Sequence, residues 1–274
     1  MKKIRVAING FGRIGRAFFK LSQHRDDIEV VAINDLGNIE NIAYLLKYDT
    51  VHGKSDLNIS VEKRDWKTVL AVNGRDVAFI QERDPAQLPW GEFDIDVVVE
   101  STGLFTEFKK AKTHLDAGAK KVVISAPGKG EPVEGVTSGT VLMGLNDDLL
   151  SQCNISSNAS CTTNASGPVV HIMHETIGVE KALLNTVHGY TSTQELVDSP
   201  CAKDWRRGRA GAQNIIPSTT GAAKAVTKVI TDLENKFDGI ALRVPVITGS
   251  VADITFVAKR DTSVEEVNDI FRNA

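Results

Sequence analysis

A glycine-rich turn near the start of the chain constrains the fold more than any other feature. Residues 10–15 follow the pattern GxGxxG, whose glycines are Gly10, Gly12 and Gly15. An apolar, strand-like run at 4–9 precedes the turn, a helical pattern at about 13–22 follows it, and a second apolar run covers 28–34. A strand, a glycine turn, a helix and a further strand predict the opening of a parallel sheet in an α/β fold.

The same turn predicts a dinucleotide site. Gly10 would permit a tight turn, Gly12 would let a pyrophosphate approach the backbone, and Gly15 would let the helix pack closely. Asp35 follows Gly15 by 20 residues, at the end of the second strand, where a carboxylate can bind both ribose hydroxyls. A carboxylate there repels a 2′-phosphate, which favours NAD over NADP. The alternative role for Asp35 is capping of the helix expected at 39–48.

The rest of the chain divides into two parts. Residues 57–80, around Asn73-Gly74, predict an antiparallel excursion, after which strands at 95–99, 121–125 and 140–145 resume the alternation with helices. From about residue 160 longer strands follow, joined by helices near 164–176 and 219–230. We therefore expect a Rossmann-type, doubly wound parallel sheet in an NAD-binding domain at 1–160. A second domain is expected at 161–274, and the resemblance described below implies that it is an α+β catalytic domain with a mostly antiparallel sheet.

Composition excludes several classes of function. The chain has 274 residues and a formal net charge of −3, so no overall positive field attracts nucleic acid or an anionic membrane. Neither a spanning apolar stretch nor a signal-peptide pattern is present, which predicts a cytoplasmic protein. Three cysteines cannot all pair within one chain, and neither they nor the histidines have metal-site spacing, so no metal is expected.

Cys161 is the candidate nucleophile. It lies where a helix is expected to begin, and a helix N-terminus stabilises a thiolate. His188, at the end of the next expected strand, is the candidate base if the strand folds back onto the thiol. The spacing leaves a second interpretation open, namely a structural core thiol and an unrelated histidine.

Five collinear segments carry a resemblance to a known family. They are INGFGRIGR at 8–16, SNASCTTN at 157–164, TVHGYT at 186–191, NIIPSTTGAAKAV at 214–226 and ALRVP at 241–245. The chain closely resembles phosphorylating glyceraldehyde-3-phosphate dehydrogenases. The resemblance implies that Cys161 forms a hemithioacetal and then a thioester, with His188 as base, that NAD is the cofactor, and that inorganic phosphate releases 1,3-bisphosphoglycerate.

The resemblance also implies roles for further residues. Substrate phosphate would bind at Thr191 and Arg243, and Arg207 matches another arginine of the phosphate sites. The positions implied for inorganic phosphate are Ser160, Thr162, Thr220 and Gly221. The positions implied for NAD are Arg13, Ile14, Asp35, Arg83, Ser101 and Ser125, beside the three glycines. The region 191–215 would touch a neighbouring subunit in a homotetramer.

Three departures from the family pattern qualify these expectations. Ala165 stands where many members have a second cysteine, and Ser199 replaces a common leucine beside the cofactor. Members also continue past the position of Ala274 through a further strand and a closing helix, so the sequence is expected to be incomplete at its C-terminus. Two alternatives therefore remain: an erythrose-4-phosphate dehydrogenase, and a truncated, inactive nucleotide-binding protein.

Overall fold

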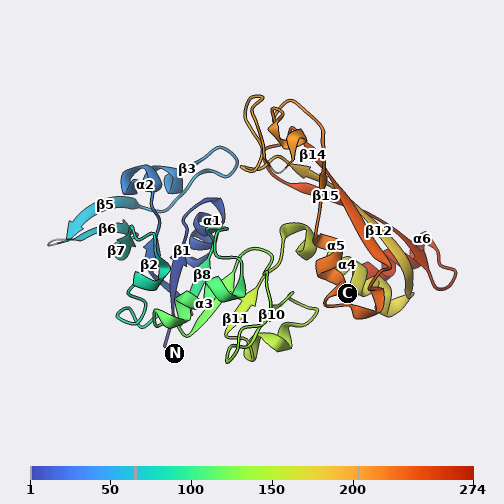
Figure 1. Ribbon diagram of the computed structural model, residues 1–274, viewed down its shortest axis with the longest axis horizontal. Helices are drawn as coiled ribbons and strands as arrows, with labels where there is room; N and C mark the ends of the chain where they lie inside the picture. Colours follow the sequence, from blue (N-terminus) through green and yellow to red (C-terminus); the bar gives the residue numbers. More distant parts are fainter. Residues whose placement is uncertain (1, 65–66, 203) are drawn as a thin grey trace. The chain divides into compact units, whose positions relative to one another are not determined.

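The computed structural model describes residues 2–64, 67–202 and 204–274. The chain forms two compact units. The first contains Met1–Val141 and Asp148–Asn158, and the second contains Leu142–Asp147 and Ala159–Ala274. Each unit has its own sheet and core, and each is described by itself (Figure 1).

The first unit is built on a nine-stranded sheet of order β10-β11-β9-β8-β1-β2-β7-β6-β5. Every neighbouring pair from β10 to β7 is parallel, whereas β6 and β5 extend the sheet as antiparallel strands. Its strands are β1 (Ile4–Asn9), β2 (Ile28–Asn34), β5 (Ile59–Arg64), β6 (Lys67–Val72), β7 (Arg75–Ile80), β8 (Val97–Glu100), β9 (Lys121–Ile124), β10 (Ser138–Thr140) and β11 (Ile155–Ser157). A separate ribbon pairs β3 (Tyr48–Asp49) with β4 (Gly53–Lys54).

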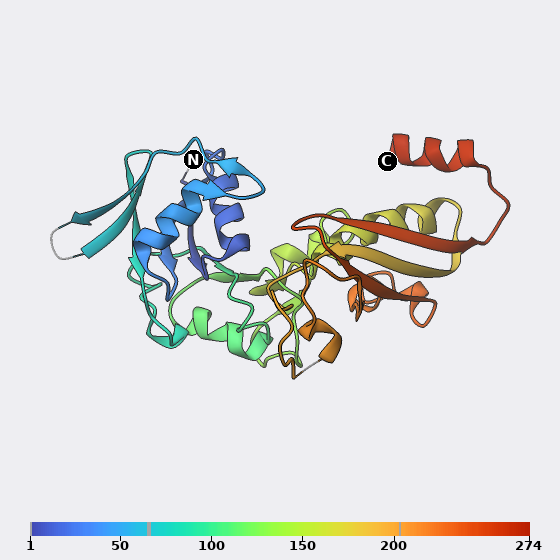
Figure 2. The same ribbon diagram turned by 90° about the horizontal axis from the view of Figure 1, so that it is seen from above.

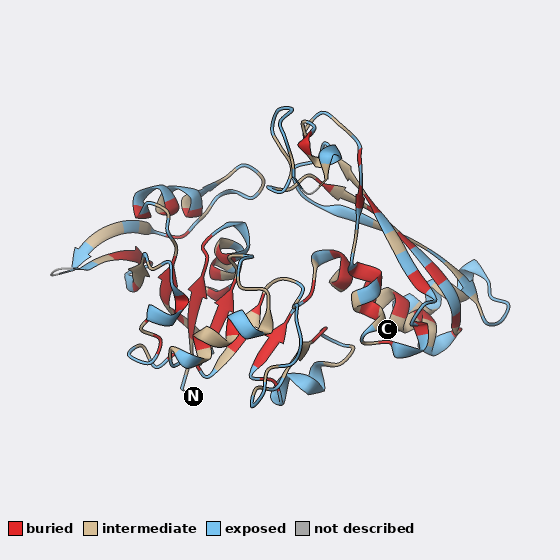
Figure 3. Ribbon diagram, viewed as in Figure 1, coloured by how far each residue is buried: buried red, intermediate tan, exposed pale blue. Residues whose placement is uncertain are grey.

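Helices cover both faces of this sheet because β1 alternates its side chains between them. Val6 and Ile8 pack with residues of α1 (Arg13–Ser22) and α2 (Ile39–Lys47), whereas Ala7 packs in a second core with α3 (Phe108–Asp116). Figure 3 shows runs of consecutive buried residues in the central strands, whose neighbouring side chains point to opposite faces. Among the described residues, this unit also contains the short 3₁₀ turn η1 (Pro85–Gln87), and η2 (Asp147–Ser151) begins at the boundary residue Asp147 and continues in the first unit. A parallel sheet buried on both faces is the predicted doubly wound arrangement.

The second unit packs helices against a four-stranded sheet of order β13-β14-β12-β15 (Figures 1 and 2). Two of its three strand pairs are antiparallel and β12–β14 is parallel. The core joins this sheet to α4, α5 and α6. Its elements are α4 (Cys161–Thr176), β12 (Val179–Gly189), η3 (Trp205–Gly208), β13 (Ile216–Thr219), α5 (Ala222–Thr227), η4 (Thr231–Leu233), β14 (Phe237–Val244), β15 (Ser250–Ala258) and α6 (Val264–Asn273). The predicted fold class is thereby confirmed.

Local differences from the sequence prediction have physical causes. The strand expected at 140–145 ends at Thr140, because the chain turns at Gly144, whose φ is +79°. The helix expected at 219–230 is shorter, since Ile216–Thr219 pairs instead with β14 as an edge strand that tolerates Pro217.

Candidate active site

The thiol of Cys161 lies at the first residue of α4. Ser160 caps this helix, its Oγ accepting a hydrogen bond of 3.1 Å from the backbone N–H of Thr163. Cys161 is exposed, whereas the two residues that follow it in the helix, Thr162 and Thr163, are buried. The cap and the buried threonines therefore fix the backbone while the sulfur faces solvent.

His188 meets that sulfur from the end of β12. Its Nε2 lies 3.2 Å from Sγ of Cys161, and its Nδ1 lies 2.7 Å from the carbonyl oxygen of Gly189. The same Nδ1 also lies 3.2 Å from Nη1 of Arg243, which can only donate. The carbonyl oxygen can only accept and is the nearer of the two, so the shorter contact favours a proton on Nδ1. Nε2 is then free to accept the thiol proton. The structure therefore brings together the two residues predicted to act as nucleophile and base.

Arg243 completes the group because β12 and β14 pair in parallel with His188 opposite Arg243. Its Nη1 donates to the carbonyl oxygen of Gly189 at 3.2 Å and to Oγ1 of Thr191 at 3.4 Å. Burial of this half-buried side chain, and the nearby positive charge of Arg207, lower the pKa of Arg243, while the Cys161 sulfur opposes that shift. Because the charges of Arg207 and Arg243 interact, an anion bound between these guanidinium groups would be stabilised by both.

Arg207 approaches the same region from η3. Its Nη2 donates to Oγ of the buried Ser218 at 2.7 Å, whereas its buried Nε has no hydrogen-bond partner among the described residues. A buried donor without a partner is costly, and an anion oxygen would satisfy it.

Two predicted phosphate residues lie at the start of α5. Oγ1 of Thr220 accepts from the backbone N–H of Ala222 at 3.1 Å, and Gly221 is the N-terminal cap residue. Within the described part of the chain, no hydrogen bond joins either residue to Cys161 or to the arginines. Ser160 and Thr162 flank the thiol, with Oγ1 of Thr162 4.0 Å from Sγ.

A cavity of about 350 Å³ opens in the first unit where β1 lies between β2 and β8. In open α/β sheets, ligands bind at the carboxyl ends of the strands beside such a reversal of strand order. The lining residues come from the ends of four strands and the segments that follow them: Asn9, Gly10, Gly12, Asn34, Asp35, Leu36, Glu82, Arg83, Ser101, Thr102, Leu104 and Phe105.

The glycine turn fits a phosphate group closely. Gly10 has φ +91°, and a Cβ on it would lie 2.6 Å from the backbone nitrogen of Thr102. A Cβ on Gly15 would lie 2.2 Å from the carbonyl oxygen of Gly10, so a side chain there would collide with the turn. Gly12 instead faces open space, with no atom within 4 Å of a built Cβ, at the uncapped N-terminus of α1. This space and the free N–H groups suit a pyrophosphate.

Asp35 occupies the position predicted for a ribose carboxylate. Its two oxygens accept from the backbone N–H groups of Phe11 at 2.7 Å and Gly37 at 2.8 Å, and each oxygen retains a further lone pair. The carboxylate does not cap α2, whose cap is Asn38, so the alternative role weighed for Asp35 is wrong.

Of the other residues predicted to bind the nucleotide, some line the cavity and some do not. Arg83 and Ser101 line the cavity, with Ser101 Oγ donating to the Gly10 carbonyl oxygen at 2.6 Å. Arg13 and Ile14 are the first residues of α1, where their backbone faces the glycine turn. Ser125 follows β9, two strands from β1, and is not part of the cavity lining.

Sequence reasoning missed the polar residues that end the strands. Asn9 and Asn34 terminate β1 and β2, are buried, and line the cavity together with Glu82 and Phe105. A polar side chain closing an otherwise apolar strand was the available signal.

Comparisons with known proteins assign both units. A model of the NAD binding domain of glyceraldehyde 3-phosphate dehydrogenase matches residues 4–108, and a model of that enzyme's C-terminal domain matches residues 160–274. The chain belongs to the glyceraldehyde 3-phosphate dehydrogenase family. Among curated relatives, the enzyme of Streptomyces coelicolor is 47% identical over 274 residues, covering 99% of this chain and 78% of its own length. The second enzyme of Bacillus subtilis is 48% identical, covering 99% of this chain and 77% of its own length.

Family membership confirms several predictions together. The resemblance, the NAD cofactor and the class of NAD-dependent dehydrogenase are borne out by both matched domains. The alternatives of an erythrose-4-phosphate dehydrogenase and an inactive nucleotide-binding protein are not favoured.

No described helix is long and apolar enough to span a membrane. In the described residues, no group of three His, Cys, Asp or Glu side chains could hold a metal ion.

Proposed function

We propose that this chain oxidises glyceraldehyde 3-phosphate to 1,3-bisphosphoglycerate, with NAD as oxidant and inorganic phosphate as acyl acceptor. The 3.2 Å contact between Sγ of Cys161 and Nε2 of His188, beside Arg243, is the observation that carries this proposal. We further propose that residues 1–160 are the NAD-binding domain, that residues 161–274 are the catalytic domain, and that the enzyme works in the cytoplasm.

The first step uses the thiol and the imidazole. Cys161 attacks the aldehyde carbon while Nε2 of His188 takes the thiol proton, and the resulting imidazolium returns that proton to the new oxyanion, giving a hemithioacetal. NAD, when bound, supplies the acceptor for the hydride that this carbon loses. His188 removes the hydroxyl proton as the carbonyl re-forms, so Cys161 holds a thioester. Inorganic phosphate then attacks that carbonyl, and the sulfur leaves as thiolate.

The arginines bind the anions that this chemistry needs. Arg243 and Thr191 are proposed to hold the substrate phosphate, and Arg207, with its unpartnered Nε, a phosphate oxygen. Ser160, Thr162, Thr220 and Gly221 are proposed to bind inorganic phosphate. In the first unit, the residues proposed to hold NAD are Gly10, Gly12, Arg13, Ile14, Gly15, Asp35, Arg83, Ser101 and Ser125.

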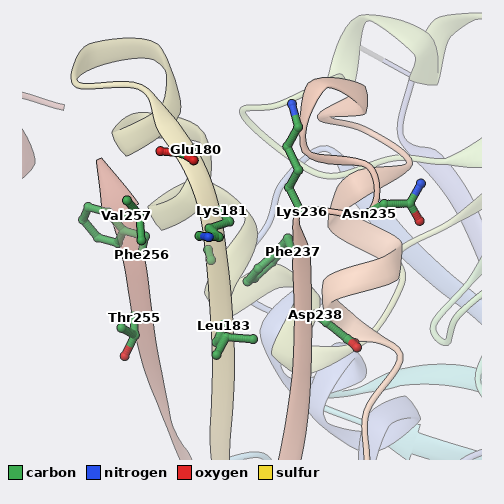
Figure 4. A pocket seen from close by; sticks show the side chains of 11 residues that line it. Glu180, Lys181, Leu183, Asn235, Lys236, Phe237, Asp238, Thr255, Phe256 and Val257 are labelled. Carbon is green, nitrogen blue, oxygen red and sulfur yellow. The ribbon is translucent and has the colours of Figure 1, made fainter. Parts of the chain in front are cut away.

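A homotetramer is the proposed assembly. The sheet face opposite the helices of the second unit exposes Leu183 by 64% and Ile240 by 59%, and Trp205 in the 191–215 region is 87% exposed. Leu183 also lines a cavity of about 540 Å³ at the start of β12 and β14, whose lining includes Phe237 and Phe256 from the helix-facing core (Figure 4). Large exposed apolar surfaces favour association with another subunit. Leu183→Glu should lower the mass measured by light scattering, and a monomeric unmodified chain would refute this assembly.

The proposed reaction is tested by NADH formation. Wild-type protein should reduce NAD only when glyceraldehyde 3-phosphate and phosphate are both present, with a lower kcat/KM for erythrose 4-phosphate. Cys161→Ser should abolish turnover, since a hydroxyl is a far weaker nucleophile than a thiol. Undiminished activity of Cys161→Ser, or NAD binding by the wild type without any turnover, would overturn the proposal.

A further inference from the structure

A buried carboxylate lies behind the nucleotide cavity without lining it. Glu100, the last residue of β8, is 1% exposed. Its Oε1 accepts from the backbone N–H of Thr102 at 2.8 Å and from the Thr102 hydroxyl. Its Oε2 accepts from Nδ2 of Asn9 at 2.6 Å and lies 3.0 Å from Nε2 of His114. A buried charge is tolerated only with such a complete set of partners.

Trp90 determines which ring nitrogen of His114 carries the proton. Its indole N–H, which can only donate, points to Nδ1 of the fully buried His114 at 3.0 Å. Nδ1 must therefore accept, so the proton of a neutral His114 lies on Nε2 and is donated to Glu100. Both oxygens of Glu100 are thus required as acceptors.

Asn9 connects Glu100 by hydrogen bonds to Asn34 at the end of the neighbouring strand β2. Because its Nδ2 donates to Glu100, its Oδ1 is left to accept from Nδ2 of Asn34 at 2.7 Å. Asn34 then clamps the segment after β7: its Nδ2 donates to the carbonyl oxygen of Glu82 at 2.9 Å, and its Oδ1 accepts from the Glu82 backbone N–H at 2.8 Å. Arg83, the next residue, lines the cavity.

The other oxygen of Glu100 orders the loop after β8. Thr102, held at its N–H and hydroxyl, accepts with Oγ1 from the backbone N–H of Leu104 at 3.0 Å. Thr102 and Leu104 both line the cavity. One buried carboxylate is therefore linked by hydrogen bonds to cavity-lining residues at the ends of β1, β2, β7 and β8.

We propose that Glu100 is a positioning residue for NAD binding. It holds the walls of the nucleotide cavity in their binding geometry without touching the cofactor, and Trp90 and His114 keep its two oxygens in place. This inference rests on the proposed nucleotide cavity, and it goes beyond the residues assigned to that cavity above.

Replacing Glu100 by Gln tests the network with little change in shape. A carboxamide offers one acceptor oxygen, so in either orientation its NH₂ group faces a donor, namely the Thr102 N–H or the donors of Asn9 and His114. The cavity walls must then move. We expect the dissociation constant for NAD to rise about tenfold, the scale on which an unsatisfied buried donor acts.

The experiment measures NAD binding by calorimetry for wild type and three variants. Glu100→Gln should bind about tenfold more weakly. Glu100→Asp keeps the charge but withdraws both oxygens, and it should bind with intermediate affinity. Val122 lies on β9, in the buried core that also contains Trp90, and Val122→Ala is the control for general destabilisation. Its Tm should fall about as far as that of Glu100→Gln, but it should bind NAD as tightly as wild type does. Alkylation of Cys161 without NAD should be equal in all four proteins.

The possible outcomes distinguish a failure of the inference about Glu100 from a failure of the proposed nucleotide cavity. Wild-type protein that fails to bind NAD overturns the cavity itself. If wild type binds and Glu100→Gln binds equally well, the cavity stands and the role of Glu100 is wrong. Equal weakening in Val122→Ala also overturns that role, because the effect is then one of stability. If Glu100→Gln does not fold, the comparison of Glu100→Asp with Val122→Ala decides by the same criteria.

Discussion

The sulfur of Cys161 lies 3.2 Å from Nε2 of His188, although 27 residues separate the two in the chain. The contact arises because α4 begins with Cys161 and is followed directly by β12, which packs against α4 and carries His188 next to its end. A helix and a returning strand thus bring the proposed nucleophile and its proposed base to one end of the second unit.

His188→Gln should lower kcat/KM about 100-fold, the scale of a lost general base. The carboxamide fills similar space but cannot take the thiol proton. Alkylation of Cys161 by iodoacetamide should slow in parallel, as followed by mass spectrometry. His171→Gln, on the partly exposed face of α4, is the matched control and should leave both rates unchanged. Equal alkylation rates in wild type and His188→Gln would contradict the assigned role.

Gly189→Ala should impair catalysis through the orientation of His188. A Cβ on Gly189 would lie 2.6 Å from the carbonyl oxygen of Val246, so the strand end or the facing turn must shift. The Gly189 carbonyl oxygen, which accepts from Nδ1 of His188, would move with it. We expect kcat to fall about tenfold, the scale of one misplaced catalytic hydrogen bond.

Gly139→Ala is the control for this substitution, since the nearest atom to its Cβ is Sγ of Cys153 at 3.8 Å. It should be as active as wild type. Normal kcat in Gly189→Ala would show that this carbonyl oxygen does not orient the imidazole.

Arg243→Lys should raise KM for glyceraldehyde 3-phosphate more than it lowers kcat. An ammonium keeps the charge, but it cannot hold the Gly189 carbonyl oxygen and Thr191 while also presenting a planar pair of donors to phosphate. We expect KM to rise about tenfold, in line with loss of a charged hydrogen bond. Arg209→Lys, at an exposed pair with Asp198, should not change KM. An unchanged KM in Arg243→Lys would remove it from the phosphate site.

Sequence alone predicted the parallel sheet, the glycine turn and the position of Asp35 beside it because each depends on local pattern. Gly10, Gly15 and Asp35 lie within one strand-turn-helix-strand unit, where spacing nearly determines position. The antiparallel excursion around Asn73 was predicted for the same reason, since a two-residue turn fixes the pairing of β6 with β7.

Sequence alone could not predict contacts set by pairing between distant strands. Arg243 neighbours His188 only because β14 pairs in parallel with β12, and Arg207 joins Ser218 through a loop without periodicity. The edge strand β13 was missed because Pro217 is atypical of strands. Long-range register depends on the packing of the whole unit.

Cys161 should be alkylated well before Cys153. Burial raises the pKa of the Cys153 thiol, and its side chain is enclosed in the first unit, whereas Cys161 is exposed. Because the thiolate is the reactive form, we expect a rate difference of at least about tenfold at neutral pH. Peptide mass spectrometry after timed iodoacetamide treatment measures both sites, and unfolded protein, in which all cysteines react, is the control. Equal rates in the folded protein would contradict the described environments.

Asp49→Asn should reduce stability in a manner that depends on pH. The backbone N–H of His52 lowers the pKa of Asp49 well below its ordinary 3.8, with the N–H of Val51 and the guanidinium of Arg13 adding to the effect against the opposing influence of burial. A lowered folded-state pKa means that the ionised carboxylate stabilises the fold above its unfolded-state pKa and that this stabilisation is lost as pH falls. Wild type should therefore have a higher Tm than Asp49→Asn at neutral pH, and the difference should shrink below about pH 4. Arg13→Gln, which keeps the two backbone contacts, should show a smaller difference, and a difference independent of pH in Asp49→Asn would refute the explanation.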